Sequence, residues 1–134
     1  MGAACPKDWT PFNDKCYIYE PKSMTYAEAQ KNCQSKGANL ASAHSVEESK
    51  LLGKIVSEGF GGKSPYIWLG GSDRAKKVLR KLNYKRRVHF KNWCQGRPKR
   101  VPGDQDCFSM QWKARCLGFS SCGAVLQSVC IKKP

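Results

Sequence analysis

Two stretches in the first half of the chain carry hydrophobic residues at the spacing of an amphipathic helix. The first, "TYAEAQKNCQSKG", opens with a capping box formed by Thr25 and Glu28 and reaches Gly37, a residue type that commonly ends helices. The second spans residues 45–59, opens with another capping box formed by Ser45 and Glu48, and is ended by Gly59. Its aliphatic side chains fall on one helical face: Leu51, Leu52, Ile55 and Val56. The pattern predicts two helices.

The remainder of the chain shows the shorter alternation of β-strands. Residues 5–20 alternate around Pro11, Asn13 and Asp14, which predicts a small hairpin. After Gly62 the apolar runs are short and bounded by turn residues, as in "YIWLGG", "VLRKLNYKRRVHF", "CFSMQW" and "AVLQSVCI". Because helices come first and most of the short strands come later, the order of elements is typical of the α+β class.

Length and composition favour one globular domain over residues 1–134. The chain has 134 residues and is 40% hydrophobic, which suits a single domain with its own core. No apolar run approaches the roughly 20 residues that span a bilayer. We expect residues 1–4 to be a leader placed ahead of a mature chain.

The cysteine content predicts four disulfides and a secreted, extracellular protein. The eight cysteines are Cys5, Cys16, Cys33, Cys94, Cys107, Cys116, Cys122 and Cys130. No C-x-x-C pair occurs, and neither His44 nor His89 is spaced with cysteines as in a zinc site. Disulfides belong to oxidising compartments. Free thiols in a cytosolic protein are the disfavoured alternative, and spacing alone leaves all 105 pairings open.

Positive charge is concentrated in one segment. The net charge is +14, yet residues 74–100 contain twelve Lys or Arg and no Asp or Glu, leaving twelve basic and ten acidic residues elsewhere. A solvated basic face is the ordinary interpretation of a charge run. However, cations this one-sided repel one another unless a polyanion or counterions compensate them. We therefore interpret residues 74–100, called the basic run below, as a binding segment.

The basic run supplies the candidate ligand-binding residues. Arg binds sulfate, phosphate and carboxylate groups bidentately, whereas Lys acts as a point charge. The predicted set is Arg74, Lys76, Lys77, Arg80, Lys85, Arg86, Arg87, Arg97, Lys99 and Arg100. The expected partner is an anionic glycan or another polyanion, with an anionic membrane surface as a further candidate. Nucleic acid fits the charge, but the expected secretion argues against a dedicated nucleic-acid site.

Enzymatic chemistry has no recognisable signature in the sequence. There is no nucleophile–base pair, no paired-carboxylate site and no phosphate-cradling glycine loop, so we expect neither catalysis nor a cofactor. Trp68, Trp93 and Trp112 fall in strand-like segments and are expected in the core rather than at a binding face. His44 precedes a helix cap and is expected to be structural.

Several segments, taken in order, resemble the C-type lectin-like domain in its long form. They are the opening "CPKDWTPFNDKCY", the helix-joining "GANLASAHSVEE", the core motif "IWLGG", and "NWC" followed by "DC" and "SVC". The resemblance covers residues 5–131, and the first half is most similar to fish type II antifreeze proteins and fish lectins. It implies two helices, short antiparallel sheets, a long-loop region and four disulfides.

The family frame also implies how the cysteines pair. The implied bridges are Cys5–Cys16, Cys33–Cys130 and Cys107–Cys122, with Cys94–Cys116 as an additional bridge that the fish branch shares. The Cys33–Cys130 bridge would close a loop of about 98 residues and join the first helix to the last strand.

The resemblance also implies where calcium ligands would stand. In sugar-binding members they come from a Glu-Pro-Asn triplet, a Glu two residues before a cysteine, and an Asn-Asp pair after a Trp. These positions correspond here to residues 97–99, Gln105 and residues 117–119. The side-chain ligands are replaced by Arg97, Lys99, Gln105, Gly118 and Phe119.

This replacement predicts loss of the family's calcium-dependent sugar binding. Calcium requires six to eight oxygen ligands, mostly from carboxylates, and of the five positions only Gln105 keeps a suitable oxygen. Asp104 and Asp106 leave a residual site as an alternative, although neighbouring cations favour salt bridges for them. The cysteines and glycines of the family are kept, whereas the residues at the functional face are basic. This indicates a scaffold that has acquired another function, naturally or by design.

The leading hypothesis is therefore a secreted, calcium-independent, non-enzymatic binding module for anionic glycans or other polyanions. Two alternatives stay open. One is an ice- or mineral-binding surface protein of the type II antifreeze kind, which would use a flatter and less basic face. The other is an antimicrobial or toxin component acting on anionic membranes.

Overall fold

Both predicted helices begin at the residues that the capping boxes indicated. The computed structural model describes residues 4–43, 45–59, 64–70, 94 and 106–134. Helix α1 covers Tyr26–Ser35, and the Thr25 hydroxyl accepts from the Glu28 N–H while the Glu28 carboxylate accepts from the Thr25 N–H. Helix α2 covers Val46–Glu58, with the Ser45 hydroxyl accepting from the Glu48 N–H at 3.1 Å. These bonds satisfy N–H groups that the first turn leaves without partners.

The glycines at the two helix ends serve different physical needs. Gly37 follows α1 with φ of 72°, a left-handed conformation that favours glycine. Gly59 caps α2 with φ of −91°, which any residue can adopt. Its need is space, because a Cβ at Gly59 would overlap the ring of Tyr19. The end of α2 therefore packs directly against the second strand.

The predicted N-terminal hairpin is confirmed. Strands β1 (Thr10–Phe12) and β2 (Lys15–Met24) are antiparallel, with Phe12 opposite Lys15. Asn13 and Asp14 form the two-residue connection, and their φ values of 49° and 61° are both left-handed. Asn and Asp tolerate this conformation better than most residues, which suits a type I′ hairpin turn.

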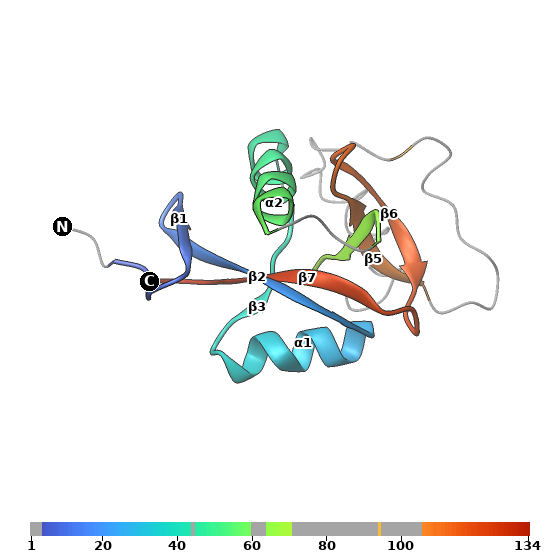
Figure 1. Cartoon of the computed structure of the whole chain (residues 1–134), viewed down its shortest axis with the longest axis horizontal. Helices are drawn as coiled ribbons and strands as arrows, with labels where there is room; N and C mark the ends of the chain where they lie inside the picture. Colours follow the sequence, from blue (N-terminus) through green and yellow to red (C-terminus); the bar gives the residue numbers. More distant parts are fainter. Residues whose placement is uncertain (1–3, 44, 60–63, 71–93, 95–105) are drawn as a thin grey trace, which may run out of the picture.

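One sheet connects all the strands that the structure describes. The further strands are β3 (Asn39–Leu40), β4 (Tyr66–Trp68), β5 (Asp106–Gln111), β6 (Cys116–Ser121) and β7 (Leu126–Lys132). Their order is β1-β2-β7-β4-β5-β6, with β3 also pairing with β7 (Figure 1). The pairs are antiparallel except for the parallel pair of β4 with β7. The predicted α+β class is confirmed; the predicted strand within residues 78–90 lies outside the described residues.

Strand β6 was not predicted. Leu117, Gly118 and Phe119 are buried one after another, so the strand lacks the alternation that reveals a half-exposed strand. It pairs along its length with β5, bringing Phe119 opposite Phe108 and Gly118 opposite Ser109.

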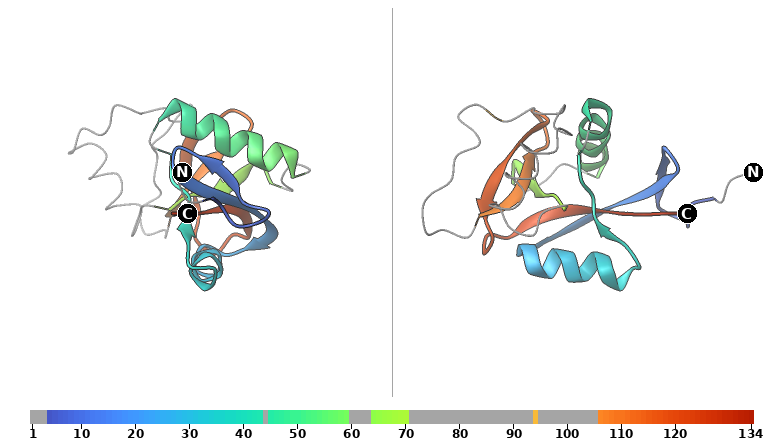
Figure 2. Two further views of the ribbon diagram at one scale, coloured as in Figure 1. Left: turned by 90° about the vertical axis from the view of Figure 1, so that its left-hand side faces the viewer. Right: turned by 180° about the vertical axis from the view of Figure 1, so that it is seen from behind.

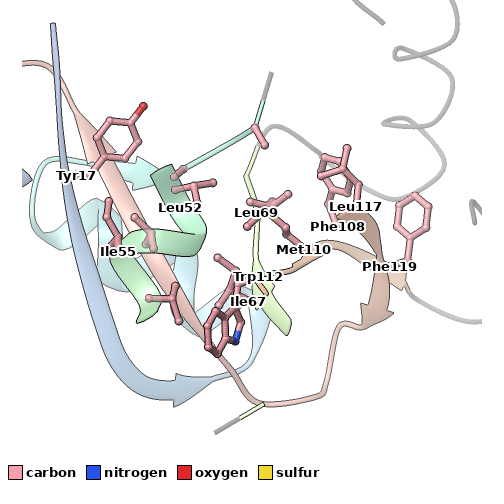
Figure 3. Close-up of a cluster of buried hydrophobic side chains, with 14 residues drawn as sticks. Tyr17, Leu52, Ile55, Ile67, Leu69, Phe108, Met110, Trp112, Leu117 and Phe119 are labelled. Carbon is pink, nitrogen blue, oxygen red and sulfur yellow. The ribbon is translucent and has the colours of Figure 1, made fainter. Parts of the chain in front are cut away.

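The two helices cover opposite faces of the sheet around β2 and β7 (Figures 1 and 2). The core on the α2 side extends from Tyr17 and Leu52 through Met110 to Phe108 and Phe119 on β5 and β6 (Figure 3). A second core cluster lies on the α1 side. The β5–β6 hairpin is thus fixed to the domain by buried apolar contacts, which are the main stabilising term in a fold of this size.

The "WLGG" motif is structural. Trp68 is fully buried, donates from its indole N–H to the Met24 carbonyl at 2.9 Å, and meets the Tyr26 ring edge-on at 5.4 Å. A Cβ at Gly70 would lie 2.5 Å from the Leu40 carbonyl oxygen, too close for any side chain. As expected, Trp68 is in the core; Trp112 is too, at 7% exposed, while Trp93 and His44 lie outside the described residues.

All four implied disulfides are present. The Cα–Cα distances are 5.6 Å for Cys5–Cys16, 5.4 Å for Cys33–Cys130, 4.9 Å for Cys94–Cys116 and 5.0 Å for Cys107–Cys122. The Cys33–Cys130 bridge joins α1 to β7 across 97 residues of sequence, and both half-cystines are fully buried. This confirms the predicted connection between the first helix and the last strand.

Two fully buried serines offer a matched test of polar satisfaction in the core. The Ser109 hydroxyl bonds with the Ser120 hydroxyl at 2.9 Å, whereas the Ser128 hydroxyl has no hydrogen-bond partner among the described residues. We expect Ser109→Ala to lower the free energy of unfolding by about 1 kcal/mol and Ser128→Ala to leave it unchanged or raise it. Chemical denaturation of the two variants measures the difference; equal losses would contradict it.

Candidate functional site

The predicted ligand-binding residues all lie outside the described residues. This applies to Arg74, Lys76, Lys77, Arg80, Lys85, Arg86, Arg87, Arg97, Lys99 and Arg100. It applies equally to Gln105 and Asp104. Their part in binding stays a prediction. The site is built below from the described residues that flank the basic run, and from the two calcium-ligand positions on β6.

Cys94 is the described residue within the basic run, and it is fixed to β6 in two ways. Its N–H donates to the Leu117 carbonyl at 2.8 Å, and its sulfur is bonded to that of Cys116. Asp106 begins β5 opposite Ser121, the last residue of β6. The described residues that border positions 95–105 are therefore held at the two ends of the same strand. Since β6 packs on the core, these border residues have a rigid support.

The two calcium-ligand positions on β6 cannot bind a metal through side chains. Gly118 has no side chain, and Phe119 is 5% exposed with its ring centroid 5.8 Å from that of Phe108 (Figure 3). Calcium needs oxygen ligands, which neither position supplies. In the described part of the chain, no group of three or more His, Cys, Asp or Glu side chains is placed to hold a metal ion. The calcium site implied by the resemblance therefore does not fit these residues.

Two phenols near α2 have perturbed acidities without being reactive at neutral pH. Burial raises the pKa of Tyr17, and the Glu48 carboxylate adds to the effect. Burial also raises the pKa of Tyr19, with a smaller contribution from Glu20. Both hydroxyls stay protonated at physiological pH, because a raised pKa moves an already weak acid further from that range.

The fold, the cysteine frame and the motifs agree with a comparison against protein families. Residues 22–132 match the family described as the lectin C-type domain. The chain belongs to this family. Membership confirms the predicted C-type lectin-like fold, and it identifies the β5–β6 hairpin as part of a domain type used for carbohydrate binding.

The relatives of this chain include a lectin and an ice-structuring protein. The galactose-specific lectin nattectin of Thalassophryne nattereri is 28% identical over 131 residues, covering 97% of this chain and 81% of the relative. A type-2 ice-structuring protein of Osmerus mordax is 31% identical over 129 residues, covering 96% and 71%. The predicted relation to fish lectins and type II antifreeze proteins is confirmed.

Solved structures of such relatives differ in their use of calcium. A calcium-independent type II antifreeze protein superposes with a TM-score of 0.70 at 27% identity, covering 97% of this chain and 95% of that one. The calcium-free form of a Ca²⁺-dependent type II antifreeze protein gives 0.70 at 25% identity, with 96% and 100% covered. Overall similarity therefore does not distinguish calcium-dependent from calcium-independent relatives. The residues at the calcium-ligand positions must be examined for that purpose.

None of the described helices has the length and apolar character needed to cross a membrane.

Proposed function

We propose that this C-type lectin-like domain is a secreted module that binds anionic glycans or other polyanions through its basic run, without calcium. The observation that carries the proposal is the concentration of charge. Twelve cations stand in 27 consecutive residues without one carboxylate, on a chain whose other residues are nearly neutral in sum.

The charge distribution favours a polyanionic ligand for a physical reason. Screening at physiological ionic strength acts over about 8 Å, so neighbouring cations of one segment still repel one another. A sulfated or phosphorylated polymer removes this repulsion and releases its own counterions on binding. Arginines such as Arg86 and Arg87 would add bidentate hydrogen bonds to sulfate groups.

Calcium independence is supported by the residues on β6. Phe119 is committed to the core and Gly118 has no side chain, so two of the five positions that would carry calcium ligands offer none. The sequence adds Arg97 and Lys99 at two more of these positions, where a cation would meet like charge. A sugar would then have to be recognised by protein groups alone.

Secretion is supported by the four disulfides. Bridges of this kind form and persist in oxidising compartments and are rare in the cytosol. An extracellular location would also bring the basic run into contact with sulfated glycans and bacterial surface polymers.

A heparin column tests the proposal. We expect the protein to elute well above about 0.15 M salt, and equally late with millimolar calcium or with a chelator. The double variant Arg86→Glu and Arg87→Glu should elute at clearly lower salt, because it reverses two charges inside the run. The matched control is Lys31→Glu with Lys50→Glu, two exposed lysines on α1 and α2. Equal losses in both variants would show a general charge effect and contradict a specific site.

Calcium-independent ice binding is a second candidate function. It is favoured by the 31% identity to a type-2 ice-structuring protein and by the likeness to a calcium-independent antifreeze structure. Thermal hysteresis without retention on heparin would support this candidate and reject the first. Leakage from anionic vesicles at similar concentrations would instead support an antimicrobial or toxin role on membranes.

A further inference from the structure

A hollow of about 430 Å³ lies between the N-terminal hairpin and the C-terminal end of α2. The N-terminal hairpin lies on the opposite side of α2 from β5 and β6 (Figures 1 and 2). The described residues that line the hollow are Thr10, Ile18, Tyr19, Pro21, Ile55 and Gly59, with Asp8 and Glu58 as the charged members. The Ile18 side chain packs against the core cluster on the α1 side, so Tyr19, Pro21 and Ile55 supply the apolar side chains. The volume is in the range of sites that hold small ligands or a few side-chain groups.

The electrostatic character of this hollow is opposite to that of the chain as a whole. Asp8 and Glu58 are exposed, and the structure shows no ion pair between them and a described basic residue. The residues that line the hollow include no Lys, Arg or His. The last turn of α2, which ends here, also has no basic residue, so the negative end of its helix dipole is not compensated. On a chain of net charge +14, the described lining of this hollow is negative, while Lys7, Lys22 and Lys54 lie next to it in sequence or on the same helix.

The shape of the wall depends on Gly59. Any Cβ at Gly59 would overlap the Tyr19 ring, so the glycine lets one edge of this ring lie directly against the end of α2. The ring and Ile55 line the hollow together with the two carboxylates. A ligand suited to both features needs an aliphatic part and a cationic end.

We propose that this hollow receives a lysine or arginine side chain from a basic segment of a partner protein. The aliphatic stem would pack on Pro21, Ile55 and the Tyr19 ring, as long cationic side chains commonly do on apolar surfaces. The charged head would lie between Asp8 and Glu58, near the Tyr19 ring, which also attracts cations. The proposal is independent of polyanion binding, because it uses none of the residues of the basic run.

The probe is a capped tripeptide, acetyl-Ala-Lys-Ala-amide, titrated into ¹⁵N-labelled protein and followed by amide chemical shifts. We expect millimolar affinity, with the largest shifts at Tyr19, Ile55 and Glu58. A second tripeptide with norleucine in place of lysine keeps the aliphatic stem and removes the charge. It should bind at least about tenfold more weakly, and raised salt should weaken the lysine peptide.

Matched variants separate the hollow from general charge effects. Asp8→Asn with Glu58→Gln should weaken the lysine peptide about tenfold, the expected result of losing two ion pairs. Glu28→Gln with Glu47→Gln makes the same change in net charge at exposed positions on α1 and α2, and it should change affinity less than about twofold. Thermal melting checks that both double variants stay folded, and heparin retention should be unchanged in both.

Three results would overturn the proposal. Equal binding of the norleucine peptide would show that charge plays no part. Equal losses in the two double variants would remove the site-specific role of Asp8 and Glu58. Shifts at the same amides on raising the protein concentration without peptide would assign the hollow to a second copy of this chain instead of a partner protein.

Discussion

Replacing Cys33 and Cys130 together by alanine is expected to lower the free energy of unfolding by about 4–5 kcal/mol, more than the loss of any other bridge. The reason is the length of the loop, since the two residues are separated by 97 positions, against 22, 15 and 11 for the other three pairs. Without this bridge the unfolded chain gains far more conformational freedom. Denaturation in guanidinium, with the slope of the transition fitted separately, measures the loss.

The matched control is the alanine pair at Cys5 and Cys16. The same chain-entropy relation gives about 3 kcal/mol for this short loop, so the two double variants should differ by about 2 kcal/mol. Because Cys33 and Cys130 are fully buried, small cavities would add to their loss. Equal losses would mean that residual structure in the unfolded chain, and not loop length, determines what each bridge contributes.

Sequence signals that act over a few residues, such as helix caps and turn residues, predicted the helices and the hairpin correctly. The capping box of Thr25 and Glu28 placed the start of α1, and Asn13 with Asp14 placed the turn of the hairpin. In both cases the residue type itself satisfies a backbone group or tolerates a left-handed conformation. The pairing of eight cysteines was different, because spacing left every pairing open and the resemblance to a family supplied the answer.

Features that depend on distant contacts were not predictable from local pattern. Gly59 was expected only to end a helix, whereas the structure shows that its essential property is the space it leaves for Tyr19. The hollow combines Asp8, before the first strand, with Glu58, at the end of the second helix, and no periodicity connects them. For the candidate ligand site, the charge distribution was visible in the sequence, whereas only the structure shows that β6 holds the border residues Cys94 and Asp106.

Phe119→Asp would place a carboxylate where the family resemblance assigns a calcium ligand, and we expect it to destabilise the domain by at least about 3–5 kcal/mol. The ring is 5% exposed and belongs to the larger core cluster, next to Phe108. Its removal leaves a cavity, and the new charge would lie among apolar side chains. Phe119→Leu keeps an apolar group at the same position and should cost only about 1–1.5 kcal/mol.

A related double variant decides whether any of the calcium chemistry of the family remains at β6. Gly118→Asn with Phe119→Asp restores the two residue types that the resemblance assigns there. A functioning site would then stabilise the folded state as calcium rises, by an amount that grows with the logarithm of its concentration. We expect no rise in melting temperature in millimolar calcium, because Arg97 and Lys99 occupy two further ligand positions in the sequence, so calcium would have too few oxygen ligands and would meet like charge. A calcium-dependent rise, in this variant or in the unaltered protein, would mean that the domain still binds the metal and that the basic run is an addition to that site.

The absence of a rise, together with the loss of stability in Phe119→Asp, would mean that the role of Gly118 and Phe119 on β6 is to pack in the core. Recognition by the domain would then have to come from its charged segments.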